Sequence, residues 1–151
     1  MKKTFKACTL IVSFLFLLTA YSVAADNFDP FDLVQVESFV QKNCKVLMEK
    51  GEILKAYKVK DKSTLKADGT AIFKAGDKMM SEAMMITAFG DCQQILNETA
   101  QEMMRAGGML LKAANMKEAV PDTFYQQIAH EGQIMISRGN LLSHEAGFCN
   151  Q

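Results

Sequence analysis

Residues 70–89, TAIFKAGDKMMSEAMMITAF, place apolar side chains on more than one face of a helix. The apolar positions of this stretch are Ile72, Phe73, Ala75, Met79, Met80, Ala83, Met84, Ile86 and Phe89. A helix that is apolar on several faces is typical of a position surrounded by other helices. We therefore expect residues 70–89 to form the central helix of a bundle.

The sequence after this stretch keeps the helical spacing. Gly90-Asp91 is predicted either to break the helix or to bend one long helix that continues through it. A new apolar stripe follows at Cys92, Ile95, Leu96, Thr99 and Met103. Gly107-Gly108 is expected to end that helix, because glycine lowers helix stability. Pro121 or Asp122 marks the start of a last long helix, which Gly139-Asn140 should stop.

The sequence before the stretch predicts one more long helix, over residues 30–50, with Asp29 as its cap. Gly51 is expected to end or bend this helix. Residues 61–69 are predicted to form a polar connection, because Asp68-Gly69 is a strong turn signal.

These segments define the expected fold class. No stretch combines strand-like alternation with β-branched residues and a hairpin turn. The economical fold is all-α, a compact bundle of four or five helices. A composition of 49% apolar and 23% charged residues also excludes a disordered chain.

The amino terminus is typical of a cleaved secretory signal. Three lysines within the first six residues precede an apolar run over residues 7–21 and then small side chains. This run is shorter than the roughly 20 apolar residues of a membrane-spanning helix. We expect residues 1–24 to be removed and residues 25–151 to form a single helical domain. The domain would be secreted or periplasmic, without membrane contact.

Charge is unevenly distributed along a chain whose formal net charge is zero. Residues 42–78 hold ten basic and five acidic side chains, whereas residues 79–151 hold four basic and eight acidic ones. A zero net charge gives no reason to expect nucleic-acid binding. Solvated helix surface explains the lysine-rich segment. The alternatives are an anionic partner or a membrane-active role for Lys58, Lys60 and Lys62.

Three cysteines remain after the signal, and an exported chain meets an oxidising compartment. Cys44 and Cys92 both lie on predicted buried stripes. We therefore predict a disulfide bond between them, with Cys149 unpaired or joined to another chain. The competing hypothesis uses Cys149 to tie down the end of the chain.

The two histidines do not make a recognisable metal or catalytic site. His130 and His144 are each followed by glutamate, but a zinc protease needs a second histidine at position 134, which is Ile134. No phosphate-binding loop or nucleophile elbow appears. We expect no metal, no cofactor and no enzymatic activity.

Methionine is abundant, with 11 residues in the chain. It fills irregular cores and makes adaptable contact surfaces. We predict an interaction surface that includes Met80, Met84, Met103 and Met104. Thioethers also bind Cu(I), which keeps a copper carrier open as an alternative.

The sequence thus favours a small, exported, non-catalytic helical protein that binds another protein. Inhibitors, immunity proteins and subunits of an envelope or secretion assembly belong to this class, and a homodimer is a further option. The alternative is a carrier that holds an apolar ligand or a soft metal between its helices.

Overall fold

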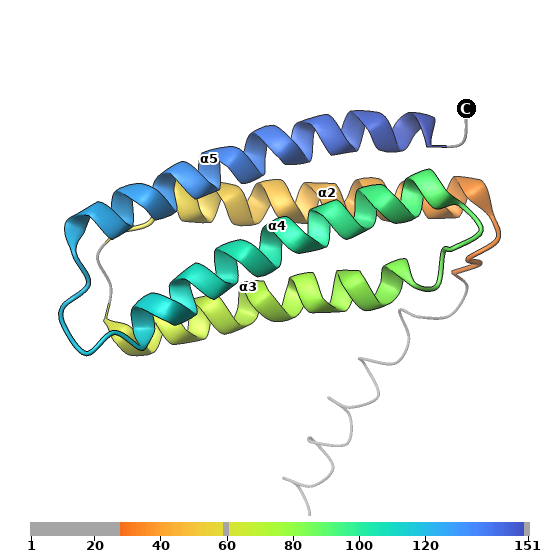
Figure 1. The fold of residues 1–151 in the computed structure, drawn as a ribbon. Helices are drawn as coiled ribbons and strands as arrows, with labels where there is room; N and C mark the ends of the chain where they lie inside the picture. Colours follow the sequence, from red (N-terminus) through yellow and green to blue (C-terminus); the bar gives the residue numbers. More distant parts are fainter. Residues whose placement is uncertain (1–27, 59–60, 150–151) are drawn as a thin grey trace, which may run out of the picture.

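The computed structural model describes residues 28–58 and 61–149. The signal peptide predicted over residues 1–24 lies outside them. The regular elements of the described residues are α2 (Leu33–Lys55), α3 (Lys62–Ala83), α4 (Gly90–Ala114), α5 (Asp122–Glu145) and the 3-10 turn η1 (Ala146–Phe148). This part of the chain is therefore an all-α bundle of four long helices, as predicted (Figure 1).

Aspartate side chains begin the first two helices. Asp32 accepts a hydrogen bond from the Gln35 side-chain amide at 3.0 Å and another from the Gln35 backbone nitrogen at 3.3 Å. The Thr64 nitrogen donates to Asp61 at 2.9 Å. These bonds hold the pKa of both carboxyl groups below the ordinary value. The prediction that Asp29 caps the first helix is wrong, because Asp32 does so.

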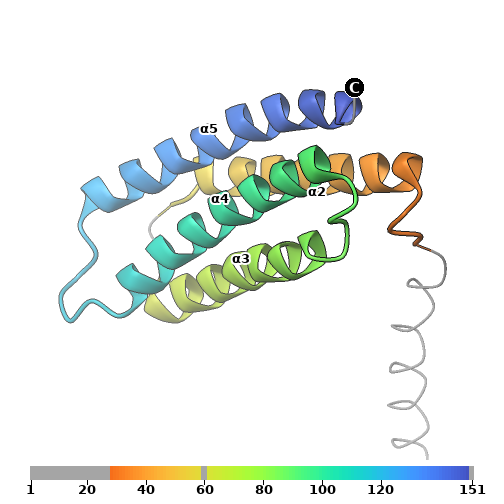
Figure 2. The ribbon, with the colours of Figure 1, turned by 45° about the vertical axis from the view of Figure 1, so that its right-hand side comes forward.

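The helices form two antiparallel pairs, α2 with α5 and α3 with α4 (Figures 1 and 2). α4 is the central helix, because it packs on α3 and also touches α2 and α5. α3 lies at the outside of the described bundle, with α4 as its close neighbour. The prediction that residues 70–89 form the central helix is therefore wrong. α3 ends at Ala83, so residues 84–89 form a turn in which Ile86 is buried. The apolar positions of residues 70–89 therefore belong to a helix and a turn, and are not several faces of one helix.

Small residues at seven-residue intervals hold α3 and α4 together. A Cβ atom placed on Gly107 would lie 2.5 Å from the Phe73 nitrogen and 2.8 Å from the Gly69 carbonyl oxygen. Seven residues away along each helix, a Cβ on Gly76 would lie 2.7 Å from the Ala100 carbonyl oxygen. Only a hydrogen atom fits at these positions. We call this line of contact the α3–α4 seam.

The α2–α5 pair is built in the same way. A Cβ atom on Gly51 would lie 2.8 Å from the Gly132 carbonyl oxygen, and one on Gly132 would lie 2.5 Å from the Gly51 carbonyl oxygen. Seven residues further along α5, a Cβ on Gly139 would lie 2.5 Å from Cγ of Met48 and 3.1 Å from the Cys44 carbonyl oxygen. We call this contact the α2–α5 seam.

Three glycines that were predicted to end helices lie inside them. Gly51, Gly107 and Gly139 belong to α2, α4 and α5, and residues 62–69 of the predicted connection form the first turns of α3. Glycine costs a helix interior roughly 1 kcal/mol relative to alanine. Close packing of two helices offsets that cost, since tertiary contacts supply most of a helix's stability.

Candidate interaction surface

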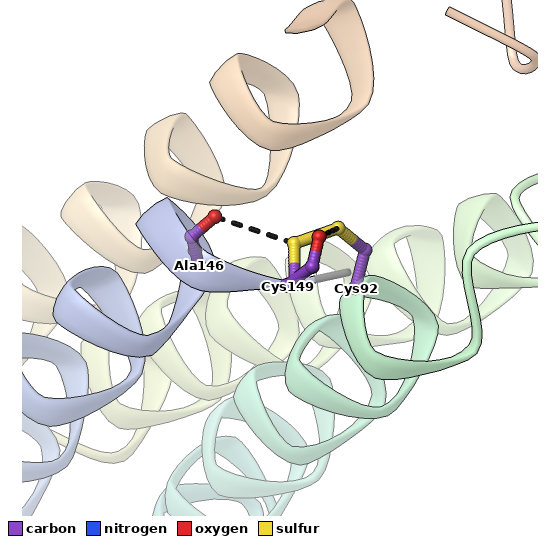
Figure 3. The surroundings of a disulfide bond; sticks show 3 residues. All are labelled: Cys92, Ala146 and Cys149. Atoms are coloured by element: carbon purple, nitrogen blue, oxygen red, sulfur yellow. Dashed lines mark hydrogen bonds between the residues drawn. A yellow bond between two sulfur atoms is a disulfide. The ribbon is translucent and has the colours of Figure 1, made fainter. Parts of the chain in front are cut away.

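A disulfide bond joins the beginning of α4 to the segment after η1. Cys92 pairs with Cys149, and their Cα atoms are 5.2 Å apart (Figure 3). The predicted bond between Cys44 and Cys92 is wrong, and the competing hypothesis, in which Cys149 ties down the end of the chain, is confirmed. Because its sulfur is already paired, Cys149 is not a free thiol for a bond to another chain.

Cys44, on α2, lies opposite a part of α4 that is too far from Cys92 for a disulfide bond. Its sulfur lies 3.6 Å from the hydroxyl oxygen of Thr99, which follows Cys92 by seven residues. That separation is about 10.5 Å along a helix, whereas bridged Cα atoms are less than about 7 Å apart. Burial raises the pKa of the Cys44 thiol, so it stays protonated and unreactive.

The four methionines of the predicted interaction surface do not share one surface. Met103 is fully buried in the core, so the prediction is wrong for this residue. Met80 and Met104 are half-buried, and only Met84, directly after α3, is 73% exposed. Adjacent residues on a helix point about 100° apart, which places Met103 and Met104 in different surroundings.

The histidines lie at different places on α5. His130 is exposed, and the His144 ring packs edge-on against Phe148 with 5.2 Å between centroids. Over residues 28–58 and 61–149, no group of three or more histidine, cysteine or acidic side chains is arranged to hold a metal ion.

Ion pairs between α4 and α5 include a buried carboxylate. Oε1 of Glu131 lies 2.5 Å from Nη2 of Arg105, which also donates to Glu102 at 2.7 Å. Burial raises the pKa of Glu131, and the nearby Arg105 offsets part of that rise. Oε1 of Glu131 makes no hydrogen bond within the described chain, so its contact with Arg105 is ionic. Arg138 and Glu98 form a second pair between these helices.

A groove lies between α2 and α3, which do not pack closely on each other. Its volume is about 240 Å³. Each helix contributes four residues at intervals of three, one and three, namely Phe39, Lys42, Asn43 and Val46 from α2, and Ala75, Lys78, Met79 and Glu82 from α3. This spacing places each set on one helical face. Two antiparallel helices therefore present matching stripes to one groove.

The walls of the groove are mostly apolar. Phe39, Val46 and Ala75 are half-buried and pack against the core, and Met79 is buried. The ring of Phe28 lies against Phe39, with 4.9 Å between centroids. The groove surface is thus continuous with the hydrophobic core.

Lysine occupies the second position of both stripes. Lys42 is exposed, and the Lys78 side chain is 77% exposed. Nζ of Lys78 lies 3.5 Å from Oε1 of Glu82, a pair so exposed that it is worth roughly 0–1 kcal/mol. The groove therefore combines an apolar surface with two accessible cations and one weakly paired carboxylate.

The groove was not predicted from the sequence, although a signal was present. Phe39 and Val46 directly precede the buried Val40 and Leu47, so the apolar face of α2 is wider than one neighbouring helix requires. The sequence did not reveal that these additional apolar residues face α3 across the groove.

Five other exposed apolar side chains belong to the start of α2, the turn after α3 and η1, and Figure 1 shows these three segments at the same end of the bundle. They are Phe31, Val34, Met84, Met85 and Phe148. These residues belong to separate segments, and single exposed apolar residues are common on protein surfaces. The groove is therefore the better-defined candidate surface.

Within the described residues, none of the helices has the length and apolar character needed to span a bilayer. Comparison of the sequence with protein-family models and curated proteins, and of the structure with solved structures, gave no match.

Proposed function

We propose that this chain is a small, exported, non-catalytic protein that binds another protein through the groove between α2 and α3. The observation that carries the proposal is the pair of facing stripes that no other described helix covers. Helices use such stripes to pack on one another in bundles and to receive a helix from a partner. An inhibitor, an immunity protein or a subunit of an envelope or secretion assembly would work in this way.

The disulfide bond supports the exported part of the proposal. Bonds such as Cys92–Cys149 persist in oxidising compartments and are rare in reducing ones. The signal peptide predicted over residues 1–24 supports it independently.

The alternative, a carrier, has weaker support. Pockets for small molecules typically enclose most of the ligand, whereas this groove is open to solvent, and so are two larger hollows of about 350 and 400 Å³ elsewhere on the described surface. A Cu(I) site would bring methionine sulfurs together, but Met103 is in the core and Met84 is exposed beyond the end of α3. A protein partner fits the open groove better.

Cross-linking in the exporting host tests the proposal. The photoreactive substitution Ala75→p-benzoylphenylalanine should give a light-dependent adduct with one defined protein, identified by mass spectrometry. The matched control, the same residue at the exposed position Gln126 of α5, should not. Adding Val46→Glu should abolish the adduct while the circular dichroism spectrum stays unchanged. Equal adducts at both positions, or none at position 75, would contradict the proposal.

A further inference from the structure

We infer that the partner enters this groove as an amphipathic helix with acidic side chains beside its apolar stripe. The inference rests on the proposed function and adds the chemical class of the partner segment.

The walls of the groove favour a helix over an extended strand. The groove spans residues 39–46 of α2 and 75–82 of α3, which is about 10.5 Å or two helical turns along each wall. Both walls are helical, so their backbone groups already bond within the helix. A strand would find no backbone partners there, whereas a helix satisfies its own backbone groups. A docked helix would also add a new neighbour to α3.

The charges beside the groove favour an acidic partner. Lys42 and Lys78 hold equivalent positions on two antiparallel helices, so both fall on the same, exposed side of the groove. Beyond the lining residues, Lys45 and Lys74 add two exposed cations on neighbouring faces of α2 and α3, and Glu49, one turn after Val46, adds one exposed carboxylate. Cations therefore still outnumber carboxylates on this side. The groove's one carboxylate, Glu82, is half-buried and lies beside Lys78. Acidic side chains flanking an apolar stripe would complement this arrangement.

The same charges argue against a second copy of this chain as the occupant. A symmetric dimer brings the same patch of both copies together. Such a contact across the groove would set Lys42 and Lys78 of one copy against the same lysines of the other. Like charges facing each other oppose association, which an acidic partner avoids.

Two synthetic peptides test the inference on the disulfide-bonded chain that begins at residue 25. Both peptides are helical, with the same leucine stripe over about five turns; one carries glutamate beside the stripe and the other lysine. Fluorescence anisotropy should show that the acidic peptide binds about ten-fold more tightly at low salt. The difference should shrink at about 0.15 M salt, because exposed charges are then screened.

Variants assign the preference to the groove. Lys42→Gln with Lys78→Gln should remove most of the ten-fold preference. The matched control, Lys112→Gln with Lys117→Gln, changes two exposed lysines outside the groove and should keep it. Val46→Glu should weaken binding of both peptides, since it blocks the apolar surface that they share. Equal affinity for the two peptides, or a preference unchanged in the groove variant, would overturn the inference.

Other outcomes separate the inference from the proposed function. If the protein cross-linked at position 75 docks through a neutral or basic segment, the inference fails and the proposed function stands. Binding of oleate without binding of either peptide would overturn the inference in favour of an amphiphile. A dimer in sedimentation that Val46→Glu dissociates would overturn it in favour of a second copy. Absence of the cross-link itself would remove the proposed function.

Discussion

The two sides of α3 meet their neighbours in different ways. Toward α4, Gly69 and Gly76 remove all side-chain volume, and the two backbones come into contact. Toward α2, the adjacent positions Ala75 and Lys78 border an open groove. Both sides of α3 carry apolar residues, so hydrophobicity alone does not explain why one side packs closely and the other does not. Close packing follows the line of small residues, and the larger or charged side chains next to that line leave the groove open.

Loss of the disulfide should have the largest effect on the free energy of unfolding. Cys92→Ser with Cys149→Ser removes a bond between residues 57 apart, and loop-closure entropy predicts a loss of about 4 kcal/mol in the free energy of unfolding. Urea denaturation measures it. The wild-type chain with added reductant is the control and should lose a similar amount. A loss below about 1 kcal/mol would show that the seams alone hold the helices together.

A single added Cβ atom should disrupt the α3–α4 seam. Gly107→Ala would force a Cβ against the backbone of Phe73 and Gly69, and should lower the free energy of unfolding by about 3 kcal/mol. A Cβ atom on the adjacent Gly108 would meet no neighbouring element within 4 Å. Gly108→Ala should therefore stabilise the protein by about 0.5 kcal/mol through helix propensity. Thermal unfolding of both variants checks the contrast, and equal effects would show that the seam is not tight.

A smaller effect is expected at the ion pairs between α4 and α5. The pKa of Glu131 is above its ordinary value of 4.5, chiefly through burial, so the folded protein favours the protonated form. The stability from this group is present below pH 4.5 and lost as pH rises through the folded pKa. Glu131→Gln should thus stabilise the protein at pH 7 more than at pH 5. Urea denaturation at both pH values tests the sign, and an advantage that grows on acidification would refute this account.

The smallest effect on stability is expected in the groove. Lys78 is exposed there, so Lys78→Gln should change the free energy of unfolding by less than about 0.5 kcal/mol. The same substitution should weaken binding of the acidic peptide several-fold at low salt, because it removes one of the two exposed cations of the groove. Denaturation and anisotropy measured on one sample separate the two effects. A large loss of stability would mean that this side is packed more like the seams.

The sequence pattern predicted the four helices correctly, but only some of their ends. Gly90 begins α4 and Pro121 directly precedes α5, and a Cβ atom on Gly90 would meet no neighbouring element within 4 Å. Gly51, Gly107 and Gly139 were also expected to end helices, because glycine lowers helix stability. Each of them instead packs against a neighbouring helix. What separates the two groups is a contact with a distant part of the chain. The seven-residue spacing of glycine on α3 and α5 was the available signal.

The disulfide and the groove show the same limit. Cys44 and Cys92 both lie on buried stripes, and only the offset between α2 and α4 decides that they are too far apart to bond. Likewise, Phe39 and Val46 indicate a wide apolar face on α2, but not what lies opposite. Local spacing predicts which side of a helix is apolar. The register between helices depends on packing that no single segment contains.

The disulfide also divides the molecule topologically. From Cys92 to Cys149 the chain is a closed covalent ring that contains nearly all of α4 and all of α5. Both walls of the groove, α2 and α3, lie outside this ring. A protease cut in the connection at residues 115–121 would leave its two products linked, whereas a cut between α2 and α3 would leave α2 attached by packing alone. The width of the groove is therefore set by noncovalent contacts, and a partner that widens it strains no bond of the ring.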